Sequence, residues 1–128
     1  MAYSTTITGG ISEMTAAIAL MANGWEVAFP SVNEVYDLVA RDPKTNTYIR
    51  VQVKTIRRRT DRRNERVVYA TKGNGEAYTT EEVDYIIGVA EDAVYMFGCE
   101  NKTEYWASDS TVDRKWTKLS VTKTQEAV

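Results

Sequence analysis

Alternation of apolar and polar side chains between residues 47 and 56 limits the fold of this chain more than any other feature. The apolar series is Ile49, Val51 and Val53, and the polar series is Arg50, Gln52 and Lys54. A period of two is that of a β-strand with one buried face. Turn-forming residues at 42–46 join this segment to an apolar run at 35–40, which predicts a β-hairpin. The sequence therefore predicts a sheet with polar side chains along one face of a rigid strand.

A helix is predicted ahead of this hairpin. Its apolar residues recur at i, i+3, i+4 and i+7, and they are Met14, Ala17, Ile18 and Met21. This spacing is typical of a helix with one buried face. We expect Ser12 to cap its N-terminus, Gly24 to stop it, and a short strand to follow at 25–29.

The second half of the chain is predicted to add mostly strands. We expect a strand at 67–71, a buried hairpin formed by residues 83–90 and 93–97, and a weaker helical segment at 112–119. A chain of 128 residues has the usual size of one domain. The expected architecture is a single α/β domain over residues 1–128, with a mixed, mostly antiparallel sheet flanked by helices.

Composition excludes several classes of enzyme. The chain has no histidine and a single cysteine, Cys99, so it can form neither a Ser-His-Asp triad, nor a Cys-His pair, nor a histidine-ligated metal site. Catalysis would have to rest on carboxylates, Lys, Tyr, Arg or a hard metal ion. The lone cysteine, with no leader and no apolar run of membrane length, leads us to expect a cytoplasmic protein without membrane contact.

Three oxygen-bearing side chains are candidates for binding a metal ion. Neighbouring strands would bring Asp37 close to Gln52, and Glu13 would point partly inward from the predicted helix. Mg²⁺ and Mn²⁺ prefer oxygen ligands, and one or two carboxylates with a carbonyl suffice for Mg²⁺. We expect Asp37, Gln52, Glu13 and the backbone carbonyl of Val53 to be the ligands. Glu13 could instead serve only as a first-turn acid that favours the helix dipole.

Lys54 is expected on the same strand face as Gln52. An ammonium group beside a metal ion can orient or activate a water nucleophile and stabilise charge on a phosphate. This combination suits hydrolysis of a phosphodiester bond. Polar residues also alternate along many exposed strands, so the order of Glu13, Asp37 and the two strand residues carries the prediction.

An Arg-rich segment follows the strand. Between Arg50 and Arg66 there are eight basic and two acidic residues, although the whole chain has a net charge of −2. Such an excess neutralises phosphates and releases counterions when DNA binds. We expect an exposed loop or hairpin end that contacts the DNA backbone and does not read its sequence. The expected contacts are Arg57, Arg58, Arg59, Arg62 and Arg63.

These motifs resemble the PD-(D/E)XK nuclease superfamily, whose core is a helix, then a strand hairpin with an acidic residue and a (D/E)-x-K tripeptide. The matching segments are Ser12-Glu13, Gly24-Trp25, Tyr36-Asp37-Leu38-Val39, Gln52-Val53-Lys54-Thr55 and Val83-Asp84-Tyr85-Ile86. They look most similar to a group containing intron-associated endonucleases and small resolvase-like enzymes. The resemblance is good over residues 1–57 and looser beyond. It implies a restriction-endonuclease-like fold and DNA cleavage that depends on Mg²⁺ or Mn²⁺.

Two residues depart from the superfamily pattern. Tyr36 stands in the place of the usual proline, and Gln52 in the place of the usual Asp or Glu. Gln52 removes one negative charge from the expected metal site but still offers a carbonyl oxygen. A Gln-x-Lys variant occurs in the group that this chain resembles, so we expect the site to be active.

The resemblance leaves three functions open. Holliday junction resolution by a twofold homodimer is favoured, because the chain is short and shows no separate sequence-reading domain. A site-specific homing or restriction-type endonuclease is the closest alternative. A DNA-binding module with a decayed nuclease site is the third, since Gln52 weakens the acidic character of the site while the arginines remain.

Overall fold

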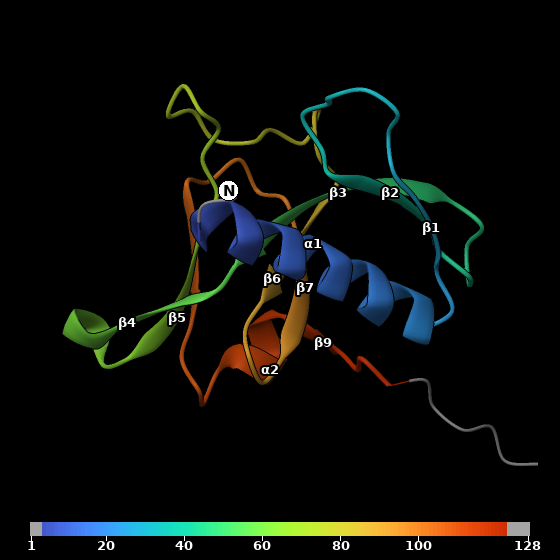
Figure 1. Ribbon diagram of the computed structural model, residues 1–128. Helices are drawn as coiled ribbons and strands as arrows, with labels where there is room; N and C mark the ends of the chain where they lie inside the picture. Colours follow the sequence, from blue (N-terminus) through green and yellow to red (C-terminus); the bar gives the residue numbers. More distant parts are fainter. Residues whose placement is uncertain (1–3, 123–128) are drawn as a thin grey trace, which may run out of the picture.

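A computed structural model describes residues 4–122 of the chain (Figure 1). The helices are α1 (Ser4–Ala22), the 3₁₀ turn η1 (Thr60–Arg62) and α2 (Val112–Lys115). The strands are β1 (Glu26–Ala28), β2 (Leu38–Arg41), β3 (Tyr48–Thr55), β4 (Arg57–Arg59), β5 (Glu65–Tyr69), β6 (Tyr85–Val89), β7 (Val94–Gly98), β8 (Glu104–Ala107) and β9 (Thr117–Leu119).

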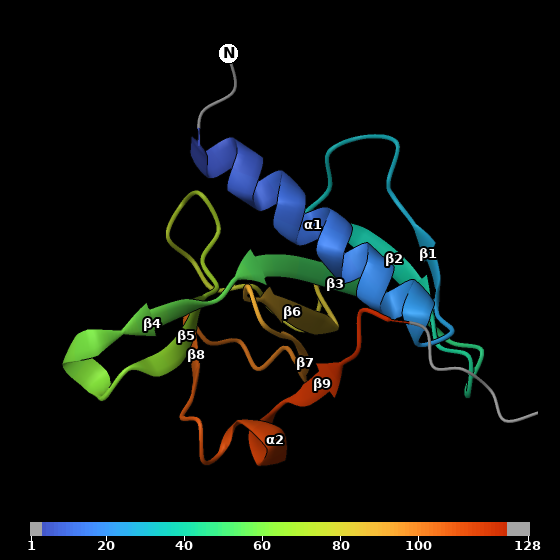
Figure 2. The same ribbon diagram turned by 60° about the horizontal axis from the view of Figure 1, so that its bottom comes forward.

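The strands form two sheets. The larger sheet has the order β1-β2-β3-β6-β7-β9, and the smaller has the order β4-β5-β8. Only the β3/β6 pair is parallel, and all other neighbours are antiparallel. The prediction of a mixed, mostly antiparallel sheet with helices is therefore confirmed. The β4–β5 hairpin projects from the body of the molecule in both ribbon views (Figures 1 and 2), so the Arg-rich segment is a hairpin and not an irregular loop.

Helix α1 is longer than predicted and buries a different face. It begins at Ser4, so Ser12 lies inside the helix and is not its cap. The predicted buried positions Met14, Ile18 and Met21 are exposed, and of that series only Ala17 is buried. The residues that face the sheet are Ser12, Ala16, Ala17, Ala19 and Leu20. Small side chains allow the helix axis to approach the sheet closely. Close packing therefore places the small residues against the sheet and leaves the larger apolar residues outside.

The helix ends where it was expected to end. The NH of Gly24 donates to the carbonyl of Met21, and Gly24 has a positive φ of 86°. Glycine adopts this left-handed conformation without a steric penalty, which makes it a common helix stop. Within residues 4–122, no helix is both long enough and apolar enough to cross a bilayer.

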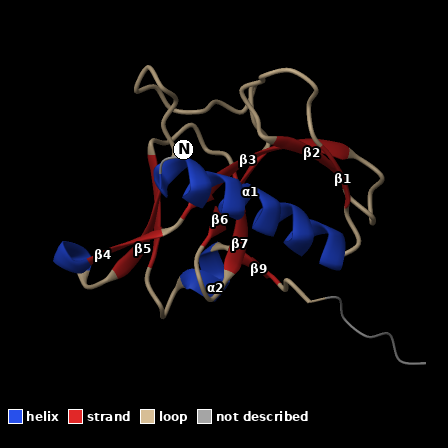
Figure 3. Ribbon diagram, in the orientation of Figure 1, coloured by secondary structure: helices blue, strands red, loops and turns tan. Residues whose placement is uncertain are grey.

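Strand β3 separates two hydrophobic clusters. The helix-side cluster joins α1 to Val51 and Val53 of β3, and the far-side cluster packs β6, β7 and β8 against Trp116 and Tyr78. Figure 3 shows α1 covering one face of the larger sheet. The predicted alternation along β3 is confirmed for Val51 and Val53. The opposite face is not an open polar stripe, however, because Gln52 is itself buried.

Gly88 of β6 allows the smaller sheet to pack against the larger one. A Cβ atom at this position would lie 2.8 Å from Cγ1 of Ile56 and 3.0 Å from Cγ2 of Val68. Ile56 connects β3 to β4, and Val68 lies on β5, so the close approach occurs where the chain leaves one sheet and enters the other. The Arg-rich hairpin is thereby fixed to the end of β3.

The predicted C-terminal helix is mostly wrong. Only Val112–Lys115 is helical, and Thr117–Leu119 forms β9. Strand β9 pairs antiparallel with β7, with Thr117 opposite Met96 and Leu119 opposite Val94. Residues 117–119 form main-chain hydrogen bonds with the open edge of β7, and these bonds stabilise a strand more than the weak helical propensity of the segment stabilises a helix. The predicted hairpin of residues 83–97 is confirmed as the β6/β7 pair.

Candidate active site

Asp37 lies one residue before β2, not inside the predicted strand. Its NH donates to the carbonyl of Val51 (2.9 Å), which continues the β2/β3 ladder by one bond. Its carboxylate Oδ2 accepts the next hydrogen bond, from the NH of Val53 (2.8 Å). The side chain therefore takes the place of a main-chain acceptor, and for that reason β2 begins only at Leu38. This contact fixes the carboxylate against the middle of β3.

Backbone geometry also brings the carbonyl of Val53 toward Asp37. In a strand, the N–H and C=O of one residue point to the same side. The N–H of Val53 meets the carboxylate of Asp37, so its carbonyl faces the same edge, beyond the last β2/β3 pair of Leu38 and Val51. Two oxygen donors that were predicted as ligands, one from a side chain and one from the backbone, are thus brought together.

Gln52 occupies the position opposite Asp37 when the β2/β3 register is continued by one residue. The residue is 7% exposed, and no hydrogen bond to its amide is found among residues 4–122. The amide atoms are not fully buried, so they still reach the surface. An amide that reaches the surface without a protein partner keeps its oxygen free to bind another group. Such a group suits a site whose polar partner comes from outside the chain.

Glu13 projects from α1 toward the same region. It is only partly exposed, and burial raises the pKa of its carboxyl group, with a further rise from the negative charge of Asp37. Burial also raises the pKa of Asp37, although the hydrogen bond from Val53 and the positive charge of Lys54 act in the opposite direction. Two carboxyl groups with raised pKa values therefore lie near each other, which is the condition that a bound cation would relieve.

Lys54 lies deeper than a typical surface lysine. Burial lowers its pKa, while the charge of Asp37 partly restores it. Its Nζ donates a long hydrogen bond to the carbonyl of Thr71 (3.5 Å) and lies 5.3 Å from the centre of the Tyr78 ring. No ion pair within 4.0 Å involves Lys54 among the described residues. The ammonium group is thus held by weak contacts and remains available to another anion.

Two further contacts at the site could not be predicted from sequence spacing. Burial, with the charge of Asp37 as a second cause, raises the pKa of Tyr78, which reaches the site from the segment between β5 and β6. Ser12 Oγ and Thr55 Oγ1 lie 2.8 Å apart and connect α1 to the end of β3. The segments Ser12-Glu13 and Gln52-Val53-Lys54-Thr55 contain the two partners of the second contact, and no sequence signal pointed to Tyr78.

A cavity of about 290 Å³ opens beside the end of β3, between α1 and the start of the hairpin. Its lining residues are Gly9, Ser12, Val53, Lys54, Thr55, Arg57 and Tyr69. Lys54 and Arg57 make this cavity positively charged. A larger cavity of about 830 Å³ lies around Trp25, Tyr85 and Trp116, and none of the predicted site residues lines it.

Most of the predicted DNA-binding arginines already have partners within the protein. Arg58 contacts Asp109 (3.0 Å), Arg59 contacts Asp61 and the hydroxyl of Tyr69, and Arg62 lies over the Trp106 ring at 3.7 Å. Arg62 also lies 3.7 Å from a carboxylate oxygen of Glu104.

Arg57 and Arg63 differ from the other three arginines. Both are exposed, and neither has an ion pair or a side-chain hydrogen bond within residues 4–122. They are the two predicted DNA contacts whose charge is not already compensated.

The oxygen donors at the end of β2 fit a hard divalent cation. No group of three or more His, Cys, Asp or Glu side chains is found in the part of the chain that the structure describes. The site nevertheless combines two carboxylates with an unpaired amide and a free-edge carbonyl, and one or two carboxylates with such neutral donors are sufficient for Mg²⁺. The absence of nitrogen and sulfur ligands disfavours zinc and copper.

Comparison with known proteins identifies the family and the fold. A family model for PD-(D/E)XK endonucleases matches residues 3–124. Among solved structures, the chain is similar to the bacterial homing endonuclease I-Ssp6803I, with a TM-score of 0.63 and 21% identity over 85% of this chain and 78% of that one. This similarity confirms the restriction-endonuclease-like fold. A search of curated proteins gave no match. Because the family model spans nearly the whole chain, the protein belongs to the PD-(D/E)XK endonuclease family.

Proposed function

We propose that the chain hydrolyses DNA phosphodiester bonds at the end of β2, with Mg²⁺ or Mn²⁺ as cofactor. One observation carries the proposal. The carboxylate of Asp37 is fixed by the N–H of Val53, directly beside the amide of Gln52, which has no hydrogen-bond partner among residues 4–122 and still reaches the surface. A cation site requires an amide oxygen that is free to bind, and this arrangement supplies one next to a fixed carboxylate.

Asp37, Gln52, Glu13 and the carbonyl of Val53 would hold the cation. When bound, it supplies positive charge that stabilises the transition state and favours ionisation of water. The chain contributes the placement of these oxygens, because Asp37 is held by the backbone and Gln52 by an inner strand. Glu13 approaches from α1, so the helix and the sheet together define the site.

Lys54 would act on the phosphate and the attacking water. Burial lowers its pKa, which makes its ammonium group a better proton donor than a solvent-exposed lysine. It lines the positively charged cavity together with Arg57, where a phosphate can enter. From there Lys54 can orient water and stabilise the negative charge that develops on the phosphate oxygens.

The hairpin would position the DNA backbone. Arg57 and Arg63 are the strongest candidates because their charges are free, and Arg58, Arg59 and Arg62 would contribute less because acidic partners already neutralise them. The hairpin leads directly from β3, so a strand of DNA lying on it would extend toward the cavity beside Lys54.

We favour a four-way DNA junction as the substrate and a homodimer as the active form. Two nicks placed symmetrically in a junction require two active sites, which a twofold dimer provides. A specific observation also supports the alternative of site-specific duplex cleavage, because the similar solved structure is that of a homing endonuclease. A DNA-binding module without catalysis is the third possibility, motivated by Gln52.

The test is cleavage of a synthetic four-way junction and of a linear duplex with the same sequences, in Mg²⁺, in Mn²⁺ and with chelator. Asp37→Asn removes the central carboxylate, and Glu91→Gln is the matched control at an exposed turn. Paired nicks in the junction that require metal and Asp37 would support a resolvase. Cleavage of the duplex at defined sites would establish the homing or restriction alternative. Tight binding without cleavage by the wild-type protein would refute a nuclease.

A further inference from the structure

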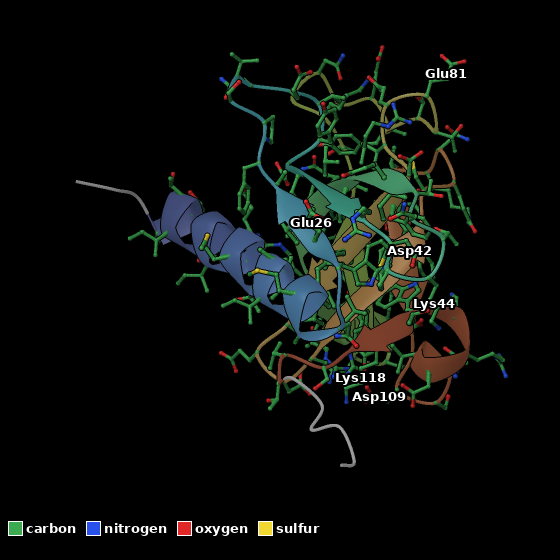
Figure 4. The ribbon with its side chains drawn as sticks, turned by 90° about the vertical axis from the view of Figure 1, so that its right-hand side faces the viewer. Glu26, Asp42, Lys44, Glu81, Asp109 and Lys118 are labelled. Atoms are coloured by element: carbon green, nitrogen blue, oxygen red, sulfur yellow. The ribbon has the colours of Figure 1, made fainter. Side chains whose placement is uncertain are left out.

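The outer face of α1 carries an unusual apolar stripe. Ile7, Ile11, Met14, Ile18 and Met21 are between 47% and 61% exposed. Their spacings are four, three, four and three residues, so they form one line along the helix, roughly 21 Å long at 1.5 Å per residue. In Figure 4, α1 lies along one side of the sheet, and some of its side chains extend away from the strands.

This spacing is the one by which two helices pack along a common seam. Apolar residues that alternate three and four positions apart insert between the side chains of a facing helix. The other side of α1 already packs on the sheet through alanines and Leu20. The helix therefore has two apolar faces, and residues 4–122 cover only one of them.

The charge of the helix argues for a particular occupant. Glu13 is the only charged residue among the 19 residues of α1. A different protein is usually selected by charges that flank such a seam, and an anionic membrane surface is selected by Lys and Arg. Neither feature is present on α1. A surface without charge is compatible with a second copy of itself.

The available area and shape are also compatible with a second copy. Five large side chains, each about half exposed, approach the several hundred Å² of contiguous apolar surface that soluble monomers rarely leave open. A stable interface buries about 800 Å² on each partner, so the stripe would form its apolar centre. No atom lies within 4 Å of a Cβ built at Gly10, which leaves room for a large side chain of the facing helix.

We propose that the α1 stripe is the dimer interface of this enzyme, with the two copies of α1 antiparallel about Met14. In this arrangement Gly10 of one copy lies beside Ile18 of the other, and Ile7 lies beside Met21. The inference rests on the proposed nuclease function only in that it identifies the surface that brings two active sites together. The interface itself depends on no metal and no DNA.

The test measures the mass of the full chain in solution, by sedimentation, without DNA or metal. The wild-type protein should be a dimer at micromolar concentration. Ile11→Glu and Ile18→Glu should give monomers with unchanged circular dichroism, because both side chains are already exposed. Val32→Glu is the control, since Val32 is exposed outside the stripe. A wild-type monomer, or a dimer that survives both substitutions, would overturn the interface.

Cysteine cross-linking tests the antiparallel order. In a Cys99→Ser background, Met14→Cys should form an intermolecular disulfide under mild oxidation, whereas Ile7→Cys should not. Efficient cross-linking of both would indicate parallel helices and overturn the proposed order. A monomeric wild-type protein that binds neutral lipid vesicles, and loses this binding in Ile18→Glu, would identify a membrane as the occupant. These results are independent of cleavage, so a dimer that cuts nothing would refute only the proposed function.

Discussion

Asp37 and Asp61 show how differently one residue type behaves in two regions of this molecule. Asp61, at the exposed hairpin, pairs with Arg59, and this pairing lowers its pKa to about 2. Asp37, at the end of β2, is shifted in the opposite direction, because burial raises its pKa. Most charges of the hairpin are paired, with Arg57 and Arg63 as the exceptions. The candidate site, in contrast, holds carboxylates that its single lysine does not fully compensate. The environment of each charge therefore distinguishes the candidate active site from the hairpin better than the number of charges does.

The largest expected effect is on the cleavage rate when Lys54 of the candidate site is replaced. Lys54→Met should reduce the single-turnover cleavage rate by about 10²–10³-fold, the typical loss when one preorganised donor to the transition state is removed. Arg59→Met should leave the rate within severalfold, because Arg59 is already paired at the hairpin. The measurement is a rapid-quench time course at saturating enzyme. Equal losses in both variants would show that the two regions contribute alike.

A second expectation separates free arginines from paired ones. The Arg57→Ala/Arg63→Ala double variant should lower the slope of log affinity against log salt by about two and weaken DNA binding about tenfold at physiological salt. The Arg58→Ala/Arg59→Ala variant, in which the lost charges were already compensated, should change the slope by less. Fluorescence anisotropy with a labelled duplex at several salt concentrations measures both. A larger change in salt slope or affinity for the Arg58→Ala/Arg59→Ala variant would contradict the distinction between free and paired arginines.

A smaller effect is expected from restoring an acid at Gln52. Gln52→Glu adds a negative charge beside Asp37, so half-maximal activity should require less Mg²⁺, on the order of tenfold less. The pKa of Asp37 should rise further when no metal is present. Metal titrations of the cleavage rate test the first point, with Asn74→Asp, which adds one negative charge at an exposed turn, as the control for the overall charge. An unchanged metal requirement would remove Gln52 from the ligand set.

The smallest expected effect is on thermal stability. Replacing an aspartate should raise the Tm at the candidate site and lower it at the hairpin. Because the folded-state pKa of Asp37 is raised, the stability of the wild-type protein falls as pH rises through the ordinary pKa of aspartate toward the raised value. Asp37→Asn should therefore raise the Tm by a few degrees at pH 7, and the gain should vanish in acid, where the carboxyl group is already protonated.

Asp61→Asn is the matched comparison for that stability effect. The lowered folded-state pKa of Asp61 gives stability that is present above the ordinary aspartate pKa of about 3.9 and is lost as pH falls toward 2. The substitution should lower the Tm slightly at pH 7, since the pair is exposed and screened. Thermal unfolding at pH 3 and pH 7 measures both variants. A lower Tm for Asp37→Asn at pH 7 would show that its hydrogen bond to Val53 outweighs the cost of burial.

The sequence predicted the parts of the site that depend on neighbouring strands. Alternation along residues 47–56 placed Gln52 and Lys54 on one face, and the hairpin brought Asp37 to Gln52. Alternation could not show that β2 begins only after Asp37, because that boundary depends on the side chain of Asp37 accepting the hydrogen bond from Val53. Tyr78 could not be predicted either, since it arrives from a segment that shares no periodicity with β3.

Two other failures have a common cause. The apolar residues of α1 were assigned to the core by size, but close packing selected the alanines, and Met14 and Ile18 remained outside. The Arg-rich hairpin was expected to contact DNA through five arginines. Two of them have acidic partners from elsewhere in the chain: Glu104 of β8 pairs with Arg62, and Asp109, just after β8, pairs with Arg58. In both cases the decisive partner lies far away in the sequence, where local patterns carry no information.

The position of β3 inside the sheet also determines how long the site keeps its shape. Hydrogen bonds to β2 on one side and β6 on the other hold the middle of the strand. Amide hydrogens in such a strand exchange with solvent mainly when the whole domain unfolds. That event takes minutes to days in many small domains, whereas enzymes commonly turn over in about a tenth of a second. Gln52 and Lys54 would then keep one arrangement through many catalytic cycles. The slow conformational changes of each cycle would occur in the DNA and in the loops.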